Sequence, residues 1–151
     1  MSLREKIKQT SEKHEVDWSK RKKDWIASVN ELNTLVQEWF SDYKTEGLVN
    51  FKLIEKQNSE EYIGTYKVNV LHLCFANDRE VIIEPMGTLV MGAWGRFDIY
   101  ARGYNSGKYY ILCYKGEYDN FTWHIVNAQT KREIKPLTKE NIEEIIEKWL
   151  S

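Results

Sequence analysis

The hydrophobic period of the chain changes at Leu48, and this change most constrains the fold. From Leu48 to Val126 apolar and polar residues alternate in short runs separated by turn residues, which is the pattern of half-buried strands. No segment between these runs is long enough for the helix of a parallel crossover, so the strands should pair as consecutive hairpins. The pattern predicts an antiparallel β-meander. The expected strands span residues 49–56, 62–76, 79–85, 88–92, 96–103, 108–115 and 121–127.

Three groups of turn residues set the expected registers of the hairpins. Asn77-Asp78 and Asn105-Ser106 are candidates for two-residue turns, and residues 117–120 for a four-residue loop. The last two turns, chosen independently, agree on a single apolar face of the sheet. The expected pairs are His72 with Ile83, Phe97 with Tyr114, Ile99 with Leu112, Ala101 with Tyr110, Tyr114 with Trp123, and Leu112 with Ile125.

A long helix is expected before the sheet, because no Pro or Gly occurs before Gly47. Ser2 and Glu5 have the spacing of a capping box, and residues 2 to about 45 read as helical. The first seventeen residues contain few apolar side chains, and they are expected as either a separate helix or an exposed extension. An apolar seam follows, and from Trp25 onward its steps alternate between four and three residues. Its members are Trp18, Trp25, Val29, Leu32, Val36, Trp39 and Tyr43.

A second amphipathic helix is expected at the end of the chain. Thr138 is a natural N-cap, and Leu137 and Ile142 have the spacing of a hydrophobic staple. The apolar stripe of this helix consists of Ile142, Ile145, Ile146, Trp149 and Leu150. Together the elements predict an α+β fold with two layers, in which both helices cover one face of a bent meander of about five to seven strands. Residues 1–151 are expected to form one domain.

Composition excludes several classes of protein. Twenty-two Lys and Arg against 23 Asp and Glu give a formal charge of −1, which argues against a strongly basic nucleic-acid-coating protein. No apolar run approaches the ~18 residues of a membrane span, and no signal peptide is recognisable. The expected location is therefore the cytoplasm, without membrane association. Three His and two Cys are scattered without metal-ligand spacing, so neither a metal nor a cofactor is expected.

One constellation could carry chemistry. The expected registers place Asp98, Cys113 and His124 side by side on three adjacent strands, on the face opposite the apolar one. A thiol beside an imidazole and a carboxylate is the arrangement that a cysteine nucleophile needs. The alternative is a small hydrophobic Cys beside an ordinary surface His. The sequence leaves both readings open.

A second set of residues could bind a ligand. Glycines between Gly87 and Gly95 predict a bend, and a bent sheet has a concave face that Trp94 and Arg96 would line. Arg96, Tyr100 and Arg102 alternate along one strand with Tyr109 expected opposite Arg102, so a small anion or single-stranded nucleic acid could bind there. The alternative is a solvated sheet face. His72 is either a ligand or base in a pocket, or a core histidine with an ordinary hydrogen-bond partner.

The leading hypothesis is a small binding or accessory module without chemistry. No specific catalytic motif occurs, and the seam with Trp18, Trp25 and Trp39 could exceed what one sheet covers. The surplus would bind another protein or a second copy of the chain. The second hypothesis is a ligand-binding module on the concave face, and the third is a cysteine enzyme built on Cys113, His124 and Asp98.

Overall fold

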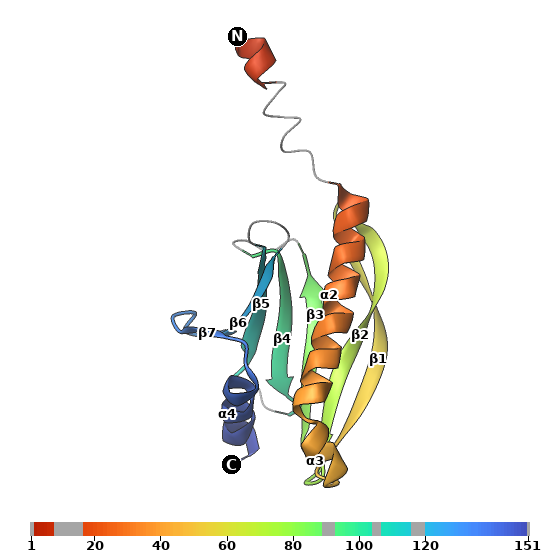
Figure 1. Ribbon diagram of the computed structural model, residues 1–151, viewed down its shortest axis with the longest axis vertical. Helices are drawn as coiled ribbons and strands as arrows, with labels where there is room; N and C mark the ends of the chain where they lie inside the picture. The colour runs from red at the N-terminus through yellow and green to blue at the C-terminus, as the bar shows by residue number, and fades with distance from the viewer. Residues whose placement is uncertain (1, 8–16, 89–92, 104–106, 116–119, 151) are drawn as a thin grey trace.

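The chain folds into one seven-stranded antiparallel sheet with its helices on one face, which confirms the predicted α+β meander (Figure 1). The computed structural model describes residues 2–7, 17–88, 93–103, 107–115 and 120–150. The order of strands in the sheet follows their order in the chain. The strands are β1 (Val49–Glu60), β2 (Gly64–Phe75), β3 (Glu80–Gly87), β4 (Gly95–Ala101), β5 (Tyr109–Lys115), β6 (Phe121–Asn127) and β7 (Ile134–Pro136). The helices are α2 (Trp18–Trp39), α3 (Ser41–Thr45) and α4 (Lys139–Leu150).

The first helical region is divided where the sequence predicted one helix. The side chain of Asp17 accepts a hydrogen bond from the amide of Lys20 (3.0 Å) and so begins α2. The helix stops at Phe40, whose φ of −101° leaves the helical range, and α3 follows as a separate turn. The capping box at the start of the chain is confirmed, because the Glu5 amide donates to Ser2 Oγ at 3.2 Å. Residues 8–16 of the expected extension lie outside the described residues.

The last helix, α4, forms as predicted. Thr138 Oγ1 accepts a hydrogen bond from the Asn141 amide (3.1 Å), which satisfies one free amide of the first turn. The apolar stripe of α4 faces the sheet, and four of its residues are buried there: Ile142, Ile145, Ile146 and Trp149. Burial of this stripe fixes α4 against the same sheet face that carries α2.

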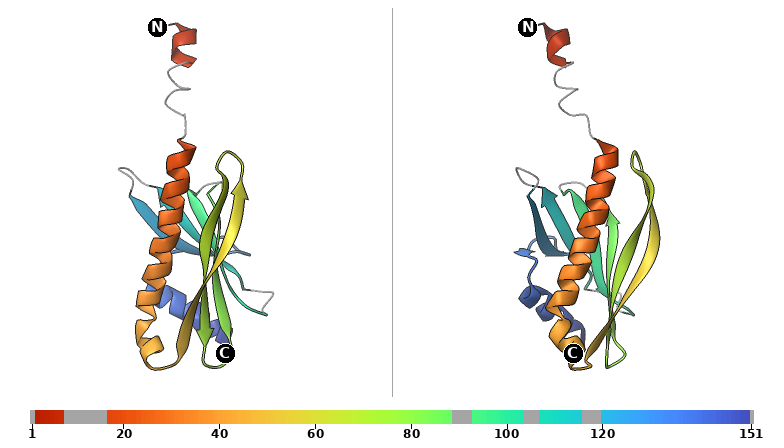
Figure 2. Two further views of the ribbon diagram at one scale, coloured as in Figure 1. Left: turned by 90° about the vertical axis from the view of Figure 1, so that its right-hand side faces the viewer. Right: turned by 45° about the vertical axis from the view of Figure 1, so that its right-hand side comes forward.

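The core lies between the sheet and the two helices (Figure 2). On α2 the seam of Trp25, Val29, Leu32 and Val36 is at most 1% exposed. From β2 to β6 the sheet contributes Leu71, Leu73, Val81, Ile83, Phe97, Ile99, Ile111 and Ile125, and the first half of β2 adds Tyr66 and Val68. We call this side of the sheet the helical face and the opposite side, on which no described helix packs, the open face.

The sheet separates between β2 and β3. Their ladder runs only from Leu71 to Cys74 on β2, although β2 itself begins at Gly64. Where the ladder ends, Asn33 of α2 donates its side-chain amide to the Asn69 carbonyl at 3.0 Å. This bond satisfies a backbone group that β3 would otherwise pair, and it accounts for an asparagine that is only 3% exposed.

Glycines mark the predicted bend. The ladder between β3 and β4 shifts register between Pro85 and Gly87, which is a β-bulge. A Cβ at Gly95 would lie 2.3 Å from Trp25 Cζ3, so α2 approaches the sheet closely there. Residues 89–92 of the expected strand 88–92 lie outside the described residues, and Thr88 is not in a strand. The short strand β7 was not predicted.

The predicted registers are wrong. Phe97 lies opposite Ile111 and Ile99 opposite Tyr109, a shift of three positions from the expected pairs. Tyr114 lies opposite Thr122, and His72 opposite Ile82, each a shift of one position. Residues 104–106 and 116–119, which held two of the expected turns, lie outside the described residues.

Candidate functional site

The structure does not bring the expected thiol constellation together. On β5, Cys113 lies opposite Trp123 on the helical face, whereas His124 lies opposite Leu112 on the open face. The two side chains therefore point to opposite sides of the sheet. Cys113 is fully buried, and its burial raises the pKa of the thiol to about 12, with a smaller contribution from the charge of Glu31. The predicted juxtaposition of Cys113 with His124 is wrong because the two side chains lie on opposite faces. The raised pKa of the Cys113 thiol is also opposite to the shift that a nucleophilic cysteine needs.

Asp98 is part of a set of ion pairs on the open face. Its carboxylate is almost fully buried and lies 3.1 Å from Arg96 Nε and 2.6 Å from Lys108 Nζ. The Arg96 guanidinium stacks over the Tyr110 ring at 4.6 Å. Tyr109, which was expected beside Arg102, lies on the helical face against Trp149 instead.

The side chains of Tyr100 and Arg102 on β4 also donate hydrogen bonds to carboxylates of the chain. The Tyr100 hydroxyl donates to Glu84 at 2.9 Å; burial and this bond raise its pKa to about 12. Arg102 donates to Glu80 at 2.9 Å, and the second oxygen of Glu80 lies 2.5 Å from His72 Nδ1. His72 therefore has an ordinary polar partner. Because Arg96 and Arg102 are each neutralised from within the chain, this face offers little net positive charge to an anion or a nucleic acid.

The tryptophans expected at a partner surface are largely internal. Trp25 is fully buried, and its ring contacts Trp94 and Phe97. Trp39 is half-buried against the core. Trp18 stacks on Tyr62 at the tip of the β1–β2 hairpin, with ring centroids 5.2 Å apart. The tryptophan seam thus belongs mainly to the hydrophobic core. Trp94, which was expected to line a ligand site, packs against Trp25.

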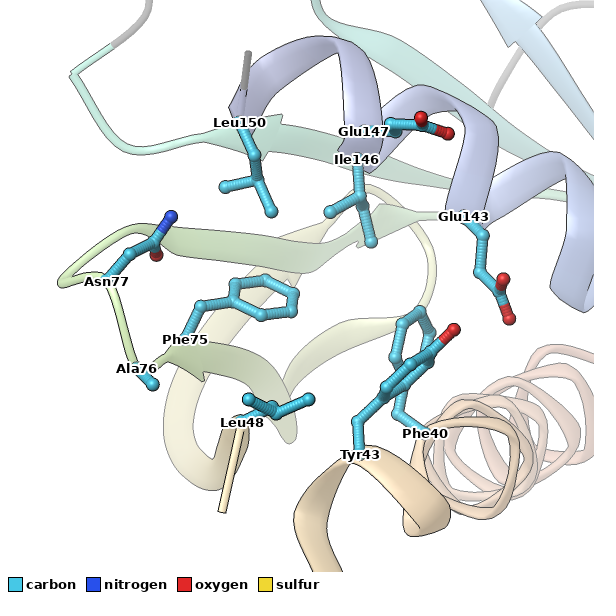
Figure 3. A pocket seen from close by; sticks show the side chains of 10 residues that line it. All are labelled: Phe40, Tyr43, Leu48, Phe75, Ala76, Asn77, Glu143, Ile146, Glu147 and Leu150. Atoms are coloured by element: carbon cyan, nitrogen blue, oxygen red, sulfur yellow. The ribbon is translucent and has the colours of Figure 1, made fainter. Parts of the chain in front are cut away.

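The described residues form an apolar groove at the end of the molecule near α3 (Figure 3). Its volume is about 630 Å³, within the range of ligand sites. Ile146 and Leu150 of α4 point toward Phe75 of β2, which lies across from them. We call this feature the α3–α4 groove. Its lining consists of Phe40, Tyr43, Leu48, Phe75, Ala76, Asn77, Glu143, Ile146, Glu147 and Leu150.

Burial and exposure divide the groove into a floor and walls. Phe40 is 2% exposed and Ile146 is 4% exposed, so they form a fixed floor. Tyr43, Phe75 and Leu150 are half-buried. Leu48, at 48% exposed, presents its apolar side chain to solvent at the rim. Apolar area that stays accessible inside a preformed groove favours binding, because its removal from water is favourable.

The charges at the groove are negative. Glu143 and Glu147 are one helical turn apart on α4, and none of the described residues that line the groove is positively charged. Lys139 lies beside it, 3.8 Å from the Glu143 carboxylate. Burial raises the pKa of the Tyr43 phenol, and Glu143, which accepts a hydrogen bond from it, raises it further. The groove therefore combines an apolar floor with a rim whose lining charges are negative, and Lys139 neutralises part of that charge at Glu143.

A second cavity is polar. It has a volume of about 360 Å³ and lies on the other side of α4, between that helix, β5–β7 and the segment before β7. Its lining mixes both signs of charge, including Arg132 and Lys148 with Glu133 and Glu144. The mixed charges do not select a class of ligand.

Sequence reasoning missed the α3–α4 groove because three distant segments build it. Phe40 to Leu48, Phe75 to Asn77 and Glu143 to Leu150 are each unremarkable alone. The one usable signal was that the apolar stripe of α4 includes Leu150, which is only half-buried.

No match was found when the chain was compared with protein-family models, with curated proteins and with solved structures. The described residues contain no group of three or more metal-ligating side chains. Within the same part of the chain, no helix is long and apolar enough to cross a membrane.

Proposed function

We propose that the protein is a binding module whose α3–α4 groove takes up the apolar face of a positively charged helix of a protein partner. The observation that carries the proposal is the combination of accessible apolar side chains with acidic residues at the rim. A helix that inserts apolar residues at i, i+3 and i+4 into such a groove is a recurring mode of peptide recognition. The proposal keeps the protein-binding hypothesis and moves its surface from the tryptophan seam to the groove.

Geometry supports a helix as the occupant. α4 and the α3 region form two walls, and Phe75 lies between them (Figure 3). Glu143 and Glu147 lie on the same side of α4, because residues four apart are neighbours on a helix. Two basic residues that are also one turn apart on the partner can face these carboxylates. The apolar contacts supply most of the affinity, and the charges set the choice of partner.

Two synthetic amphipathic peptides test this function by fluorescence anisotropy. Both carry leucines at helical spacing, and their polar positions are lysines in one and glutamates in the other. The full chain should bind the lysine peptide at least about tenfold more tightly, because one charge reversal near a carboxylate is worth about 1.4 kcal/mol or more in such a site. Salt should weaken binding of the lysine peptide.

Leu48→Lys should weaken binding of the lysine peptide by about tenfold, because it removes an apolar contact and adds a repelling charge. Leu53→Lys is the matched control, since Leu53 is 50% exposed but does not line the groove. Equal affinity for both peptides, or equal effects of the two substitutions on binding of the lysine peptide, would refute the proposed function.

A further inference from the structure

The outer half of the β1–β2 hairpin is attached to the rest of the sheet without a backbone ladder. The ladder between β1 and β2 is complete over both strands. On the other side of β2 the ladder to β3 begins only at Leu71, so residues 64–70 pair with no described strand there. Figure 2 shows the hairpin diverging from β3 toward its tip. We call residues 56–68 the hairpin arm and the rest of the described fold the body.

One face of the hairpin arm lies against the body. Tyr66 and Val68 of β2 are each 4% exposed and belong to the core. On β1 the half-buried side chains of Lys56, Asn58 and Glu60 alternate with exposed ones, as in a strand with one face covered. These polar side chains, rather than backbone groups, reach β3 and the residue that follows it.

Two of the polar contacts end on β3. Lys56 Nζ lies 2.8 Å from the carboxylate of Glu84. Asn58 donates its side-chain amide to the carbonyl of Pro85 at 3.2 Å. Proline has no N–H to offer a neighbouring strand, so β2 could not form a full ladder with β3 at this position. Side chains of β1 therefore take the place of the missing ladder.

The third contact is made by Glu60. Its carboxylate accepts hydrogen bonds from the amide of Thr88 at 2.8 Å and from the hydroxyl of Tyr66. A Cβ at Gly87 would lie 2.7 Å from Glu60 Oε1, so the glycine makes room for this carboxylate. Arg21 of α2 donates to the Thr88 carbonyl at 2.7 Å, and its charge interacts with that of Glu60. The fully buried Thr88 thus joins the hairpin arm to α2 and β3.

These two carboxylates differ from Glu80 on the same sheet. Glu80 bonds to Arg102 of β4 and to His72 of β2, and both strands are also joined to β3 by backbone ladders. Loss of its charge leaves those ladders in place. Glu60 and Glu84 connect elements that no ladder joins, so loss of their charges weakens the attachment itself.

We infer that the hairpin arm is a hinged element that Glu60 and Glu84 hold against the body and that acid releases. The hinge lies near Asn69, where the ladder to β3 ends. Hydrogen bonds to an ionised carboxylate are stronger than those to a neutral group, so protonation weakens both attachments. Opening uncovers the apolar faces of Tyr66 and Val68. The charged and titratable groups that face the two carboxylates are Arg21, Lys56, Tyr66, Asp98, Tyr100 and Lys108.

Thiol labelling of a buried position on the hairpin arm measures its opening. In a Cys74→Ser background, Val68→Cys places a thiol on the arm, and Cys113 of β5 reports opening of the body. The probe is 4,4′-dithiodipyridine, and each rate is divided by the rate in denaturant at the same pH. The thiol at position 68 should react at least about tenfold faster than Cys113, because the arm opens without the body. Ile63→Cys gives a second reporter on the arm.

Substitutions then separate the two motions. Glu60→Gln and Glu84→Gln should each accelerate labelling at position 68 about fivefold at neutral pH. Ile125→Val, in the core under β6, should accelerate labelling of Cys113 and leave position 68 unchanged, because the body stays folded while the arm is open.

Acid gives the second readout. Lowering the pH from neutral to about 3.5 should accelerate labelling at position 68 at least about fivefold, because both carboxylates lose their charge. The double variant Glu60→Gln/Glu84→Gln should label equally at both pH values. Glu55→Gln is the matched control and should behave like the parent chain, because its exposed ion pair with Lys67 joins only β1 and β2.

Two outcomes overturn the inference. One is equal labelling of position 68 and Cys113, with both rates raised by Ile125→Val, since arm and body would then open together. The other is labelling at position 68 that responds neither to acid nor to the two Gln substitutions.

Discussion

At the scale of single residues, the clearest constraint is the contact between Gly95 and Trp25. The backbone at Gly95 does not adopt a left-handed conformation. Glycine is required there because a larger residue would collide with Trp25. A methyl group would lie 2.3 Å from a fully buried ring that has no room to move away.

Gly95→Ala should lower the free energy of unfolding by about 1–3 kcal/mol, as overpacking of a core does. Urea unfolding measures the change. Trp25→Phe is destabilising by itself, but the double variant should be less destabilised than the sum of the two, because the smaller ring makes room for the methyl group. If the losses of unfolding free energy in the two single variants simply added in the double variant, the proposed collision between position 95 and Trp25 would be contradicted.

Cys113 illustrates how burial decides reactivity. A thiol that is fully buried and whose pKa is raised to about 12 has almost no thiolate at neutral pH. In a Cys74→Ser background, Ellman's reagent should therefore not react with the native chain and should react at once in denaturant. Rapid reaction of the native chain at neutral pH would show that Cys113 is accessible and would revive the cysteine hypothesis.

At the scale of elements, the open face of the sheet is held by ion pairs that cross strands. Lys56 of β1 lies 2.8 Å from Glu84 of β3, and Tyr100 of β4 donates to the same carboxylate. Burial alone would raise the pKa of Glu84, but these two hydrogen bonds outweigh it and leave the pKa lowered. A carboxyl group whose pKa is lower in the folded state stabilises the fold above its unfolded pKa of about 4.3 and loses this contribution as pH falls.

Glu84→Gln should accordingly destabilise the chain by about 1 kcal/mol near neutral pH, and the difference from the wild type should shrink below about pH 4. Thermal or urea unfolding across this range measures it. Glu55→Gln is the matched control: Glu55 pairs with Lys67 at 3.6 Å, but both side chains are more than 60% exposed, so no measurable change is expected. A difference that stays constant with pH would contradict this assignment.

Most elements were predictable from sequence, but β7, the break between α2 and α3, and the strand registers were not. The Ser2/Glu5 capping box, the Thr138 cap and the stripe of α4 act locally, so their signals are present in the residues themselves. In β5, by contrast, Tyr109 to Tyr114 are all apolar or aromatic, so alternation does not say which residues face the helices. The fully buried side chains proved to be Ile111 and Cys113. Cys113 therefore faces the helices, and the expected cluster of Cys113 with His124 does not form.

The loop before β5 explains why that register was missed by three positions. Gly103 and Gly107 both have positive φ, 86° and 89°, a conformation that glycine adopts without strain. The β4–β5 ladder closes at Ile99 and Tyr109, so the connection is longer than the two-residue turn that Asn105-Ser106 suggested. Lys108, at its end, reaches Asp98 at 2.6 Å. Contacts of this kind join residues of different segments, so the local sequence pattern does not predict them.

At the scale of the whole molecule, the sheet uses its helical face for the core and its open face for ion pairs. The proposed binding site, the α3–α4 groove, lies where several elements end. The α3–α4 groove forms where α4, the α3 region and the end of β2 come together, and Phe75 and Leu48 remain partly uncovered there. No single segment predicts such a site, since its parts come from three separate stretches, residues 40–48, 75–77 and 143–150.

The central claim is that this groove binds a basic, apolar helix. Heteronuclear NMR tests it most directly: the lysine peptide is titrated into the ¹⁵N-labelled full chain, and the amides that shift are mapped. We predict shifts confined to residues 40–48, 75–77 and 143–150. Shifts centred on the open face around Tyr100 and Arg102, or no shifts at all, would contradict the claim.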